Sequence, residues 1–562
     1  MRVMEAPGRG TAPVADPEAG VSEALDVVAM AAAGSGVAAG GSALADVPED
    51  PEGPPFASWT VRLLAIGTVA ALVAGLVLRF WTRSHLWLDE ALTVDIASRP
   101  LRDLSGLLRQ DGAPPLYYAL LHVWTGWFGT SALAVRSLGG IIGVATVPLA
   151  WVAGRRLGGR TVAWGAMLLV ATSPFAVRYD TETRMYALVA LETVLGVLAL
   201  DRALSRPRPG NLAAVAAVTA ALLYTHYWSI YLLATVACWL AFQAWRGRPA
   251  WKPGAARALV AVVVGGLAFL PWVPTFLFQS AHTGTPWATP ASFAAMVSAV
   301  GSFAGGSSSQ GRALGLAFFA LAGLALCGAA TDRRHISIDI RTRPVGRPLA
   351  VVVAGTLALA VIGGLVSSSA FDARYASVVF IPLILLVSLG LVVFRDRRVR
   401  TGVLAVAVVL GLAAAVPNVW TDRTQAGQVA AAIDAAARPG DVVAYCPDQL
   451  GPAVARLLPS DRYRQVTYPR ADGPEVINWI DYAAAVRGSS PLAFAQRLQA
   501  LAAGGHRIFV VWAPGYQAFG QRCEGVVQTL QAAPGASVTG RVVGDSHLYQ
   551  PMWLVEIGPA AP

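Results

Sequence analysis

Charged residues are scarce in this chain of 562 residues: only 14% are Asp, Glu, Lys or Arg, whereas 55% are hydrophobic. A mean hydropathy of +0.54 is too high for ordinary soluble domains and predicts many membrane-spanning helices. The net charge of +10 does not indicate a nucleic-acid partner, because the arginines form no single basic face and lie between apolar runs instead. The lipid bilayer is therefore expected to be the main solvent of the chain.

Cysteine is also rare, and its spacing does not favour a metal centre. The four cysteines form neither a CxxC pair nor a Cys/His pattern of the kind that binds zinc or an iron–sulfur cluster. Cys446 and Cys523 share the C-terminal region, and they could pair if that region faces an oxidising compartment. Two unpaired buried thiols are an equally good interpretation. No GxGxxG or P-loop motif occurs in that region, so nucleotide binding there is not supported.

Long apolar runs predict about eleven membrane-spanning helices. The loops between them alternate between arginine-rich and weakly charged, and the positive-inside rule places the arginine-rich set in the cytoplasm. Residues 114–128 are apolar but too few for a usual span, so we expect a helix at the outer interface, rich in Tyr and Trp. The N-terminus is then inside and the C-terminus outside. The predicted spans are 61–80, 133–153, 161–177, 185–200, 211–224, 229–244, 259–278, 312–330, 349–366, 376–394 and 401–416.

Composition divides the chain into three parts. Residues 1–55 are rich in Ala, Gly, Pro and acids, which predicts a disordered cytoplasmic tail and not a signal peptide. Residues 56–420 hold the predicted spans and the loops of the outer face. In residues 421–562, strand-like runs such as 441–446 and 507–512 alternate with amphipathic helices. This pattern predicts a small soluble α/β domain outside the membrane.

The first outer loop carries an acidic pair, Asp89 and Glu90, directly after the apolar residues of LWLDEA. Adjacent acids can simply favour the start of a helix through its dipole. A carboxylate held at membrane level beside an apolar wall also has a raised proton affinity, which suits a general base acting on a sugar hydroxyl. The same loop ends in QDGAPPLYY, which contributes Asp111 and two prolines that fit the start of a helix.

The second outer loop, RYDTETRMY, concentrates charges at the mouth of two spans. Taken alone, Arg178, Asp180, Glu182 and Arg184 form a solvated, salt-bridged loop. If the loop binds a phosphate diester, one of the arginines supplies hydrogen-bond donors. In that case Glu182 either orients the arginine or shares a metal ion with a carboxylate of the first loop. The residues alone favour neither reading.

Three further polar positions stand out against their apolar surroundings. His226 lies in an aromatic turn, where it is either part of an interfacial belt or a ligand. Arg374 follows a weakly charged outer loop, against the positive-inside trend, and so needs an anionic partner such as Asp372 or a lipid phosphate. Glu192 falls inside a predicted span, where an ionisable group is costly and indicates function.

These motifs, in this order, resemble those of the GT-C glycosyltransferases. They are the acidic pair in WLDEA, the PPLYY segment, the YxxExRMY loop, the YTHY turn and a late RY pair. The nearest branch is the protein O-mannosyltransferase and aminoarabinose-transferase family, and the resemblance covers roughly residues 61–394. Two positions depart from it. Ala113 stands where many relatives have His, and Asp180 with Thr181 replaces a common Ser-Gln pair.

The resemblance implies a GT-C fold and an inverting transfer of a hexose or pentose from a polyprenyl-phosphate donor at the outer face of the cytoplasmic membrane. The acceptor is a glycan, glycolipid or protein. In such an enzyme Asp89 is the base, Glu182 supports the acceptor, the base or a divalent ion, and Arg374 binds the donor phosphate. The candidate residues are Asp89, Glu90 and Glu182 for catalysis; Arg184, Arg374 and Tyr375 for the donor phosphate; Asp111, Tyr117, Asp180, Tyr186, His226 and Tyr227 for substrate; and Asp89 and Glu182 for a metal.

Three other classes fit the sequence less well. An outer-face polysaccharide ligase is expected to gather its Arg and His in a large late loop, but the loop at residues 367–375 is short. A transporter with a charged outer gate usually shows repeated halves with broken helices, and no such repeat is evident. A structural scaffold gives no reason for so many ionisable groups on one face. A lipid-linked-sugar-dependent glycosyltransferase therefore explains the sequence best.

Overall fold

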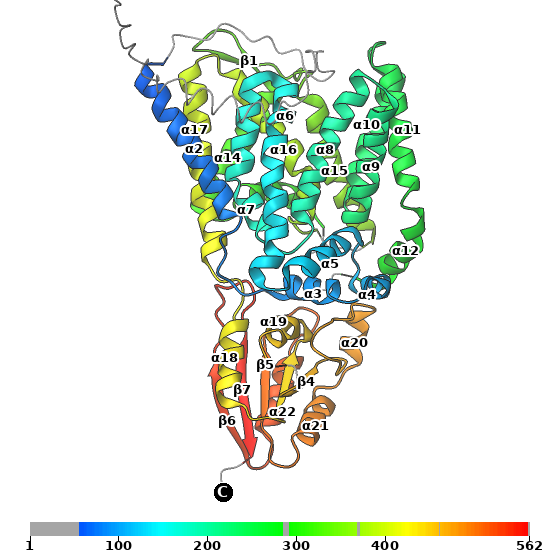
Figure 1. The fold of residues 1–562 in the computed structure, drawn as a ribbon, viewed down its shortest axis with the longest axis vertical. Coiled ribbons are helices and arrows are strands. Elements are labelled where there is room, and N and C mark those ends of the chain that lie inside the picture. Colours follow the sequence, from blue (N-terminus) through cyan, green and yellow to red (C-terminus); the bar gives the residue numbers. More distant parts are fainter. Residues whose placement is uncertain (1–55, 285–290, 368–370, 460, 560–562) are drawn as a thin grey trace, which may run out of the picture. The chain divides into compact units, whose positions relative to one another are not determined.

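The computed structural model describes residues 56–284, 291–367, 371–459 and 461–559, so the predicted tail at residues 1–55 lies outside the described part. Up to Trp420 the described chain is helical except for one short hairpin (Figure 1). The long helices are α2 (Ser58–Leu78), α6 (Ala132–Thr172), α8 (Tyr186–Ser205), α9 (Pro209–Thr225), α10 (Ser229–Arg246), α11 (Lys252–Leu267), α14 (Ser309–Cys327), α15 (Arg347–Ser367) and α17 (Arg397–Trp420). The shorter ones are α3 (Leu88–Ala97), α4 (Leu101–Asp111), α5 (Leu116–Phe128), α7 (Pro174–Asp180), α12 (Val273–His282), α13 (Phe293–Phe303) and α16 (Phe380–Gly390).

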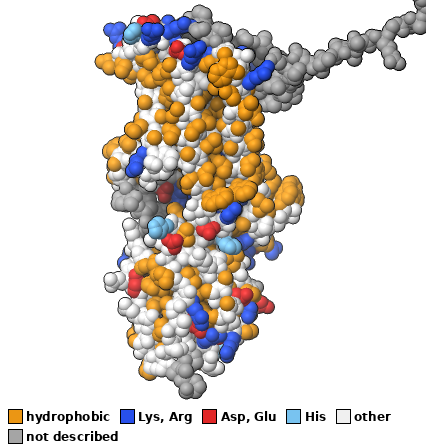
Figure 2. Space-filling view, turned by 90° about the vertical axis from the view of Figure 1, so that its left-hand side faces the viewer, with side chains coloured by type: hydrophobic (Ala, Val, Ile, Leu, Met, Phe, Trp, Pro, Cys, Tyr) orange, Lys and Arg blue, Asp and Glu red, His pale blue; other side chains and the backbone are white. Residues whose placement is uncertain are grey.

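Seven of the described helical segments are long and apolar enough to cross a membrane by length and composition. Each of the eleven predicted spans overlaps a helix, but the span predicted at 312–330 ends too late, because Gly328–Ala330 form strand β1. Three of these helices, α8, α9 and α10, are not among the seven, and the chain is a helical protein with several candidate membrane spans. Figure 2 shows hydrophobic side chains covering the helical part, with Lys and Arg gathered at the end that carries β1 (Gly328–Ala330) and β2 (Ile336–Ile338).

Helix α6 accounts for two predicted spans, because it folds back on itself at a pair of glycines. As one straight helix its 41 residues would reach roughly 62 Å, about twice the hydrocarbon thickness of a bilayer. Gly158 and Gly159 break the helical geometry, and Gly159 has φ +75°, a conformation that favours glycine. A Cβ at Gly154 would lie 2.6 Å from the Val162 carbonyl oxygen, so the two halves begin side by side.

The outer-loop helices α3, α4 and α5 lie across one end of the bundle (Figure 1). Helix α5 has 13 residues, which span about 20 Å and are too few to cross a bilayer perpendicularly. This agrees with the interfacial helix expected for residues 114–128. Helix α13 was not expected, because its 11 mostly apolar residues resemble neither a span nor a polar loop. It buries Phe303 against the rings of Phe175 and Phe380.

Residues after Trp420 contain a five-stranded mixed sheet with the strand order β4-β3-β5-β7-β6. Strand β3 runs parallel to β4 and β5, whereas β7 runs antiparallel to β5 and β6. The expected strands at 441–446 and 507–512 and the helices that alternate with them are present, but the antiparallel β6 and β7 were not predicted. The elements are α18 (Ala426–Ala436), β3 (Val442–Cys446), α19 (Gly451–Ala455), β4 (Arg464–Thr467), α20 (Tyr482–Gly488), α21 (Pro491–Leu501), β5 (Ile508–Trp512), α22 (Arg522–Gln531), β6 (Ala536–Val542) and β7 (Trp553–Pro559).

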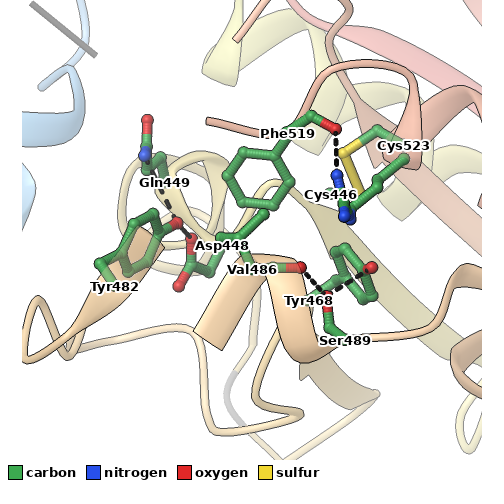
Figure 3. Close-up of a disulfide and its surroundings, with 10 residues drawn as sticks. Cys446, Asp448, Gln449, Tyr468, Tyr482, Val486, Ser489, Phe519 and Cys523 are labelled. Atoms are coloured by element: carbon green, nitrogen blue, oxygen red, sulfur yellow. Dashed lines mark hydrogen bonds between the residues drawn. A yellow bond between two sulfur atoms is a disulfide. The ribbon is translucent and has the colours of Figure 1, made fainter. Parts of the chain in front are cut away.

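Cys446 and Cys523 form a disulfide, so the first of the two sequence interpretations is the one observed (Figure 3). The bond joins the last residue of β3 to the first turn of α22. It closes a long segment, because the two cysteines are 77 residues apart. A cross-link of this kind restricts the unfolded chain far more than the folded one.

We predict that replacing both cysteines, Cys446→Ser with Cys523→Ser, lowers the free energy of unfolding of this region by about 4 kcal/mol, because the open chain regains loop entropy. Thermal unfolding of the full chain in nanodiscs, with and without reductant, measures the loss. The matched control is Cys238→Ser with Cys327→Ser, since both of those thiols are free. Titration of four free thiols in the unreduced protein would contradict the pairing.

Candidate active site

Asp89 lies in the first turn of α3, at the end of the bundle where the outer loops meet. The helix begins after Trp87, whose backbone N–H donates to the Glu90 carboxylate at 3.4 Å. This contact satisfies one of the backbone N–H groups left free at a helix start. The two acids then differ in environment. The Asp89 side chain keeps 20% of its surface exposed, whereas the Glu90 side chain keeps none.

Glu90 is held by a buried guanidinium. Arg136 donates to both carboxylate oxygens, at 2.7 Å from Nε and 2.6 Å from Nη2, and the Thr183 backbone N–H donates at 3.1 Å. Burial raises the pKa of Glu90, but the charges of Arg136 and Arg423 and the hydrogen bonds outweigh it, so the net pKa is lowered. Glu90 therefore stays ionised and, through Arg136 and the Thr183 N–H, connects α3 to α6 and to the loop at residues 181–185.

Two guanidinium groups converge on Asp89. Arg374 Nη1 donates to its carboxylate at 2.8 Å, and Arg184 Nε lies 4.0 Å away. Arg374 also contacts Asp372, with 3.3 Å between Nε and Oδ2. The Nε atoms of both arginines are buried and make no hydrogen bond, although each lies near a carboxylate, Asp372 for Arg374 and Asp89 for Arg184. A carboxylate flanked by cationic donors can accept a proton while a neighbouring anion is bound.

Arg184 is connected to the first outer loop through hydroxyl groups. Its Nη1 donates to Thr93 Oγ1 at 2.9 Å and to the Tyr118 hydroxyl at 3.3 Å. The Tyr118 hydroxyl in turn donates to Asp111 at 2.7 Å. Burial raises the pKa of Asp111, against the charge of Arg184 and the bond from Tyr118, which lower it. The loops around Asp89 and Asp111 therefore share one polar network.

His226 completes the inner side of the cluster as a neutral ring. Its Nδ1 accepts from the Trp228 backbone N–H at 3.1 Å, which leaves the proton on Nε2. Burial and the charges of Arg184 and Arg374 lower the pKa of His226 to about 3. The rings of Tyr186 and Tyr375 lie on either side, with centroids 5.8 and 5.7 Å away. At neutral pH the ring can donate a hydrogen bond without adding charge.

Glu182 forms a second buried carboxylate near Asp89. Arg178 Nη1 lies 3.0 Å from its Oε2, and neither carboxylate oxygen makes a hydrogen bond. Burial raises the pKa of Glu182, and the charges of Arg178 and Arg423 oppose that rise only in part. The described residues contain no cluster of three His, Cys, Asp or Glu side chains suited to a metal. Any divalent ion at Asp89 and Glu182 would need ligands from the substrate or from solvent.

Some of the predicted site residues lie elsewhere. Asp180 points into the bundle, where Arg79 Nε lies 2.8 Å from its carboxylate, and a Cβ at Gly143 would overlap that carboxylate. The Nη groups of Arg79 donate to backbone carbonyl oxygens of α2 and α6, so the Arg79–Asp180 pair fixes α2 to α6 and α7. The Tyr227 hydroxyl bonds to Gln279 and Trp272, away from Asp89. Tyr117 is buried with no hydrogen-bond partner for its hydroxyl.

The structure adds residues that sequence reasoning missed. Arg136 lies at the outer end of a predicted span. Like Arg374, it runs against the positive-inside trend, and this signal could have identified it from the sequence. Arg423 donates to the Thr181 carbonyl oxygen at 2.9 Å and to its hydroxyl at 2.7 Å, and no local pattern marks it. Burial and the charge of Arg178 lower the pKa of Arg423 to about 9. Tyr549 stacks edge-to-face on Trp87 at 4.8 Å.

Comparison with solved structures shows that this arrangement, apolar helices with a polar site at one end, is a fold that the chain shares with ArnT. The chain resembles the crystal structure of ArnT from Cupriavidus metallidurans in the apo state, at a TM-score of 0.54 and 16% identity over 90% of this chain and 100% of that one. It also resembles ArnT from the same organism bound to undecaprenyl phosphate, at 0.52 and 16% over 90% and 99%. A comparison with curated protein sequences found no match.

Residues 112–274 match the family model described as dolichyl-phosphate-mannose-protein mannosyltransferase. This segment runs from the end of the first outer loop past the YTHY turn, and so includes three of the motifs on which the resemblance was based. The predicted family resemblance is confirmed, and with it the enzyme class, a glycosyltransferase. The structural likeness at 16% identity supports the fold alone.

We predict that Glu90→Gln destabilises the protein by about 3–5 kcal/mol, because it leaves Arg136 buried without a counter-charge. Thermal unfolding in nanodiscs measures the effect. Asp89→Asn is the matched control: it also removes one carboxylate charge from α3 but at a partly exposed position, so it should unfold close to the wild-type temperature. Equal unfolding temperatures for Glu90→Gln and wild type would show that the pair is not structural.

Proposed function

We propose that this protein transfers a sugar from a polyprenyl-phosphate donor to an acceptor hydroxyl on the outer face of the cytoplasmic membrane, with inversion at the anomeric carbon. The observation that carries the proposal is the convergence of Arg374 and Arg184 on the partly exposed carboxylate of Asp89. A carboxylate beside cationic donors supports the proposal, because such a transfer requires a proton acceptor and a group that stabilises the leaving phosphate.

In the proposed reaction Asp89 removes the proton from the acceptor hydroxyl as its oxygen attacks the anomeric carbon. The bond from that carbon to the phosphate oxygen breaks, and its electron pair leaves with the polyprenyl phosphate. Arg374 and Arg184 stabilise the charge that develops on the phosphate, since guanidinium groups bind phosphate oxygens in a charge-assisted manner. Nε2–H of His226 is a further donor on the same side. One displacement inverts the configuration and needs no covalent intermediate.

The other acids take supporting roles in this proposal. Glu90 is saturated by Arg136 and a backbone N–H, so it positions α3 and is not the base. Glu182 is the remaining buried carboxylate, whose oxygens make no hydrogen bond in the structure. We assign it to the acceptor or to a divalent ion shared with Asp89. Asp180 and Tyr227 are assigned to the helix packing described above and not to substrate.

An apolar cavity in the helical bundle is suited to bind the polyprenyl chain of the proposed donor. It lies between α8, α9, α10, α11, α15 and α16, and nearly all of its lining is apolar, including Val197, Leu222, Leu232 and Val352. Helix α8 begins at Tyr186 and α9 ends beside His226, so the helices that line the cavity also carry site residues. An isoprenoid chain suits such a lining because each buried methylene gains about 0.8 kcal/mol.

The disulfide supports an outer location for the site. Disulfides persist in oxidising compartments, and Cys446–Cys523 lies in the C-terminal region that contacts the loops around Asp89. The arginine-rich loops fall at the opposite end of the bundle, as Figure 2 shows for the end that carries β1. Both observations favour a cytoplasmic-membrane enzyme with its site and C-terminal region outside.

We predict that Asp89→Asn abolishes sugar transfer, with a loss of at least about 1000-fold in kcat, because the base is removed while the fold is kept. The assay combines purified protein in nanodiscs, a panel of radiolabelled polyprenyl-phosphate hexoses and pentoses, and a cell-envelope acceptor extract, with and without chelator. Asp103→Asn, on exposed surface of α4, is the matched control. Undiminished transfer by Asp89→Asn would refute the assignment of the base.

We predict that Arg374→Gln weakens binding of undecaprenyl phosphate by about 30-fold, the effect of losing one charge-assisted contact worth about 2 kcal/mol. Titration in nanodiscs with a fluorescent undecaprenyl phosphate measures it in the absence of any acceptor. Arg246→Gln, at the other end of the helices, is the control. Equal affinity of Arg374→Gln and wild type would place the donor phosphate elsewhere.

A further inference from the structure

Glu192 is a buried acid of α8 that the proposed reaction does not use. Only 5% of its surface is exposed. Its Oε1 accepts a hydrogen bond from Thr225 Oγ1 at 2.8 Å, whereas its Oε2 is buried and makes no hydrogen bond. An acidic side chain inside an apolar bundle is costly, because it gives up its hydration for few partners. An apolar side chain of similar size would cost the fold less, so we expect Glu192 to serve function more than stability.

The partner of Glu192 is the last residue of α9, the residue directly before His226. Helix α9 ends at Thr225, and His226 continues in an extended conformation with φ −155° and ψ 130°. The His226 backbone N–H still donates to the Leu222 carbonyl oxygen at 3.0 Å, so the last turn of α9 sets the direction in which His226 leaves the helix. Thr225 itself is fully buried. Holding its side chain against α8 therefore fixes the point from which His226 projects.

Helix α8 contacts the same turn a second time, through its first residue. The centroid of the Tyr186 ring lies 5.8 Å from that of His226, and the Tyr375 ring lies 5.7 Å away. These rings limit how far the imidazole can rotate. The hydrogen bond between Glu192 and Thr225 holds the backbone that carries the imidazole. The ring and its backbone are thus both fixed from α8.

We propose that Glu192 is a positioning residue, which accepts from Thr225 and thereby directs the Nε2–H of His226 toward the donor phosphate. The inference rests on the proposed function, in which that N–H is a donor to the phosphate. A hydrogen-bond donor stabilises charge that develops in a reaction most effectively when it is held in place beforehand. The role requires an acceptor oxygen at position 192 and not a negative charge. Glutamine, which keeps a carbonyl oxygen, therefore replaces Glu192, and leucine does not.

The first test compares stability with donor binding. We expect Glu192→Leu to unfold in nanodiscs at or above the wild-type temperature, because a costly buried acid is removed. The same variant should bind fluorescent undecaprenyl phosphate about tenfold more weakly, as His226→Phe should, since each loses the contribution of the His226 donor. The double variant should bind no more weakly than His226→Phe alone, because both changes remove one interaction. Glu192→Gln should bind close to wild type.

Asp201→Leu is the matched control, since Asp201 is a buried acid near the other end of α8, where it pairs with Arg156 at 3.1 Å. Its affinity for undecaprenyl phosphate should equal that of wild type. The inference is overturned if Glu192→Leu binds as tightly as wild type, or if Glu192→Gln binds as weakly as Glu192→Leu. It is also overturned if the losses of Glu192→Leu and His226→Phe add in the double variant.

A second measurement follows His226 without any donor. Solid-state nuclear magnetic resonance is recorded on the full chain with ¹⁵N in its seven histidines, and His226→Phe identifies the His226 signal by its loss. Wild type should show an unprotonated Nδ1 that accepts from Trp228 and a protonated Nε2. Glu192→Leu should shift or split this signal, whereas Glu192→Gln and Asp201→Leu should not. Failure of wild type to bind undecaprenyl phosphate would refute the proposed function, whereas an unchanged His226 signal in Glu192→Leu would refute the positioning role alone.

Discussion

The buried ion pair between Glu90 and Arg136 is the interaction on which the site depends. Burying two charges in a protein interior costs several kcal/mol each, and only close bidentate geometry with additional hydrogen bonds offsets that cost. Here the geometry is complete, because Thr183 and Trp87 contribute backbone N–H donors. Since Glu90 is adjacent to Asp89, the Glu90–Arg136 ion pair fixes the direction of the Asp89 carboxylate. Glu90 is held in place by its ion pair, while the neighbouring Asp89 stays partly exposed and is positioned for the proposed role of base.

The C-terminal region takes part in the same network. Arg423 reaches the Thr181 carbonyl and lies 3.9 Å from Glu90, and Gln550 holds the start of α3 through the Leu88 N–H. Arg456 pairs with Asp95 on the outer face of α3. Residues hundreds of positions apart in the chain thus converge on one short helix. The C-terminal region therefore packs against the helix that carries Asp89.

Sequence reasoning located the helices and much of the site, because apolar length and charge asymmetry are strong local signals in a membrane protein. Asp89, Arg184, Arg374 and His226 were each singled out locally, and the structure brings them together. The structure places Asp180 apart from this group, paired with Arg79, a partner that lies a hundred residues away inside an apolar run and could not be predicted locally. Arg423 and Tyr549 could not be found, since their significance lies wholly in long-range contacts.

The sheet was predicted only in part for a similar physical reason. Strands β3 and β5 are buried on both faces and read as continuous apolar runs, whereas β6 is exposed along most of its length and carries no alternation. Helix α13 was overlooked because it is shorter than a span. In each case the missing information was a tertiary partner and not a local preference.

The central claim is that Arg374 and Arg184 hold the donor phosphate beside Asp89. The most direct measurement is a cryo-electron microscopy structure of the full chain in nanodiscs with bound undecaprenyl phosphate. We expect phosphate density within hydrogen-bond distance of both guanidinium groups, with the lipid chain in the apolar cavity between α8, α9 and α15. Phosphate density at the arginine-rich end of the bundle, or phosphate beyond hydrogen-bond distance of both arginines, would contradict the account.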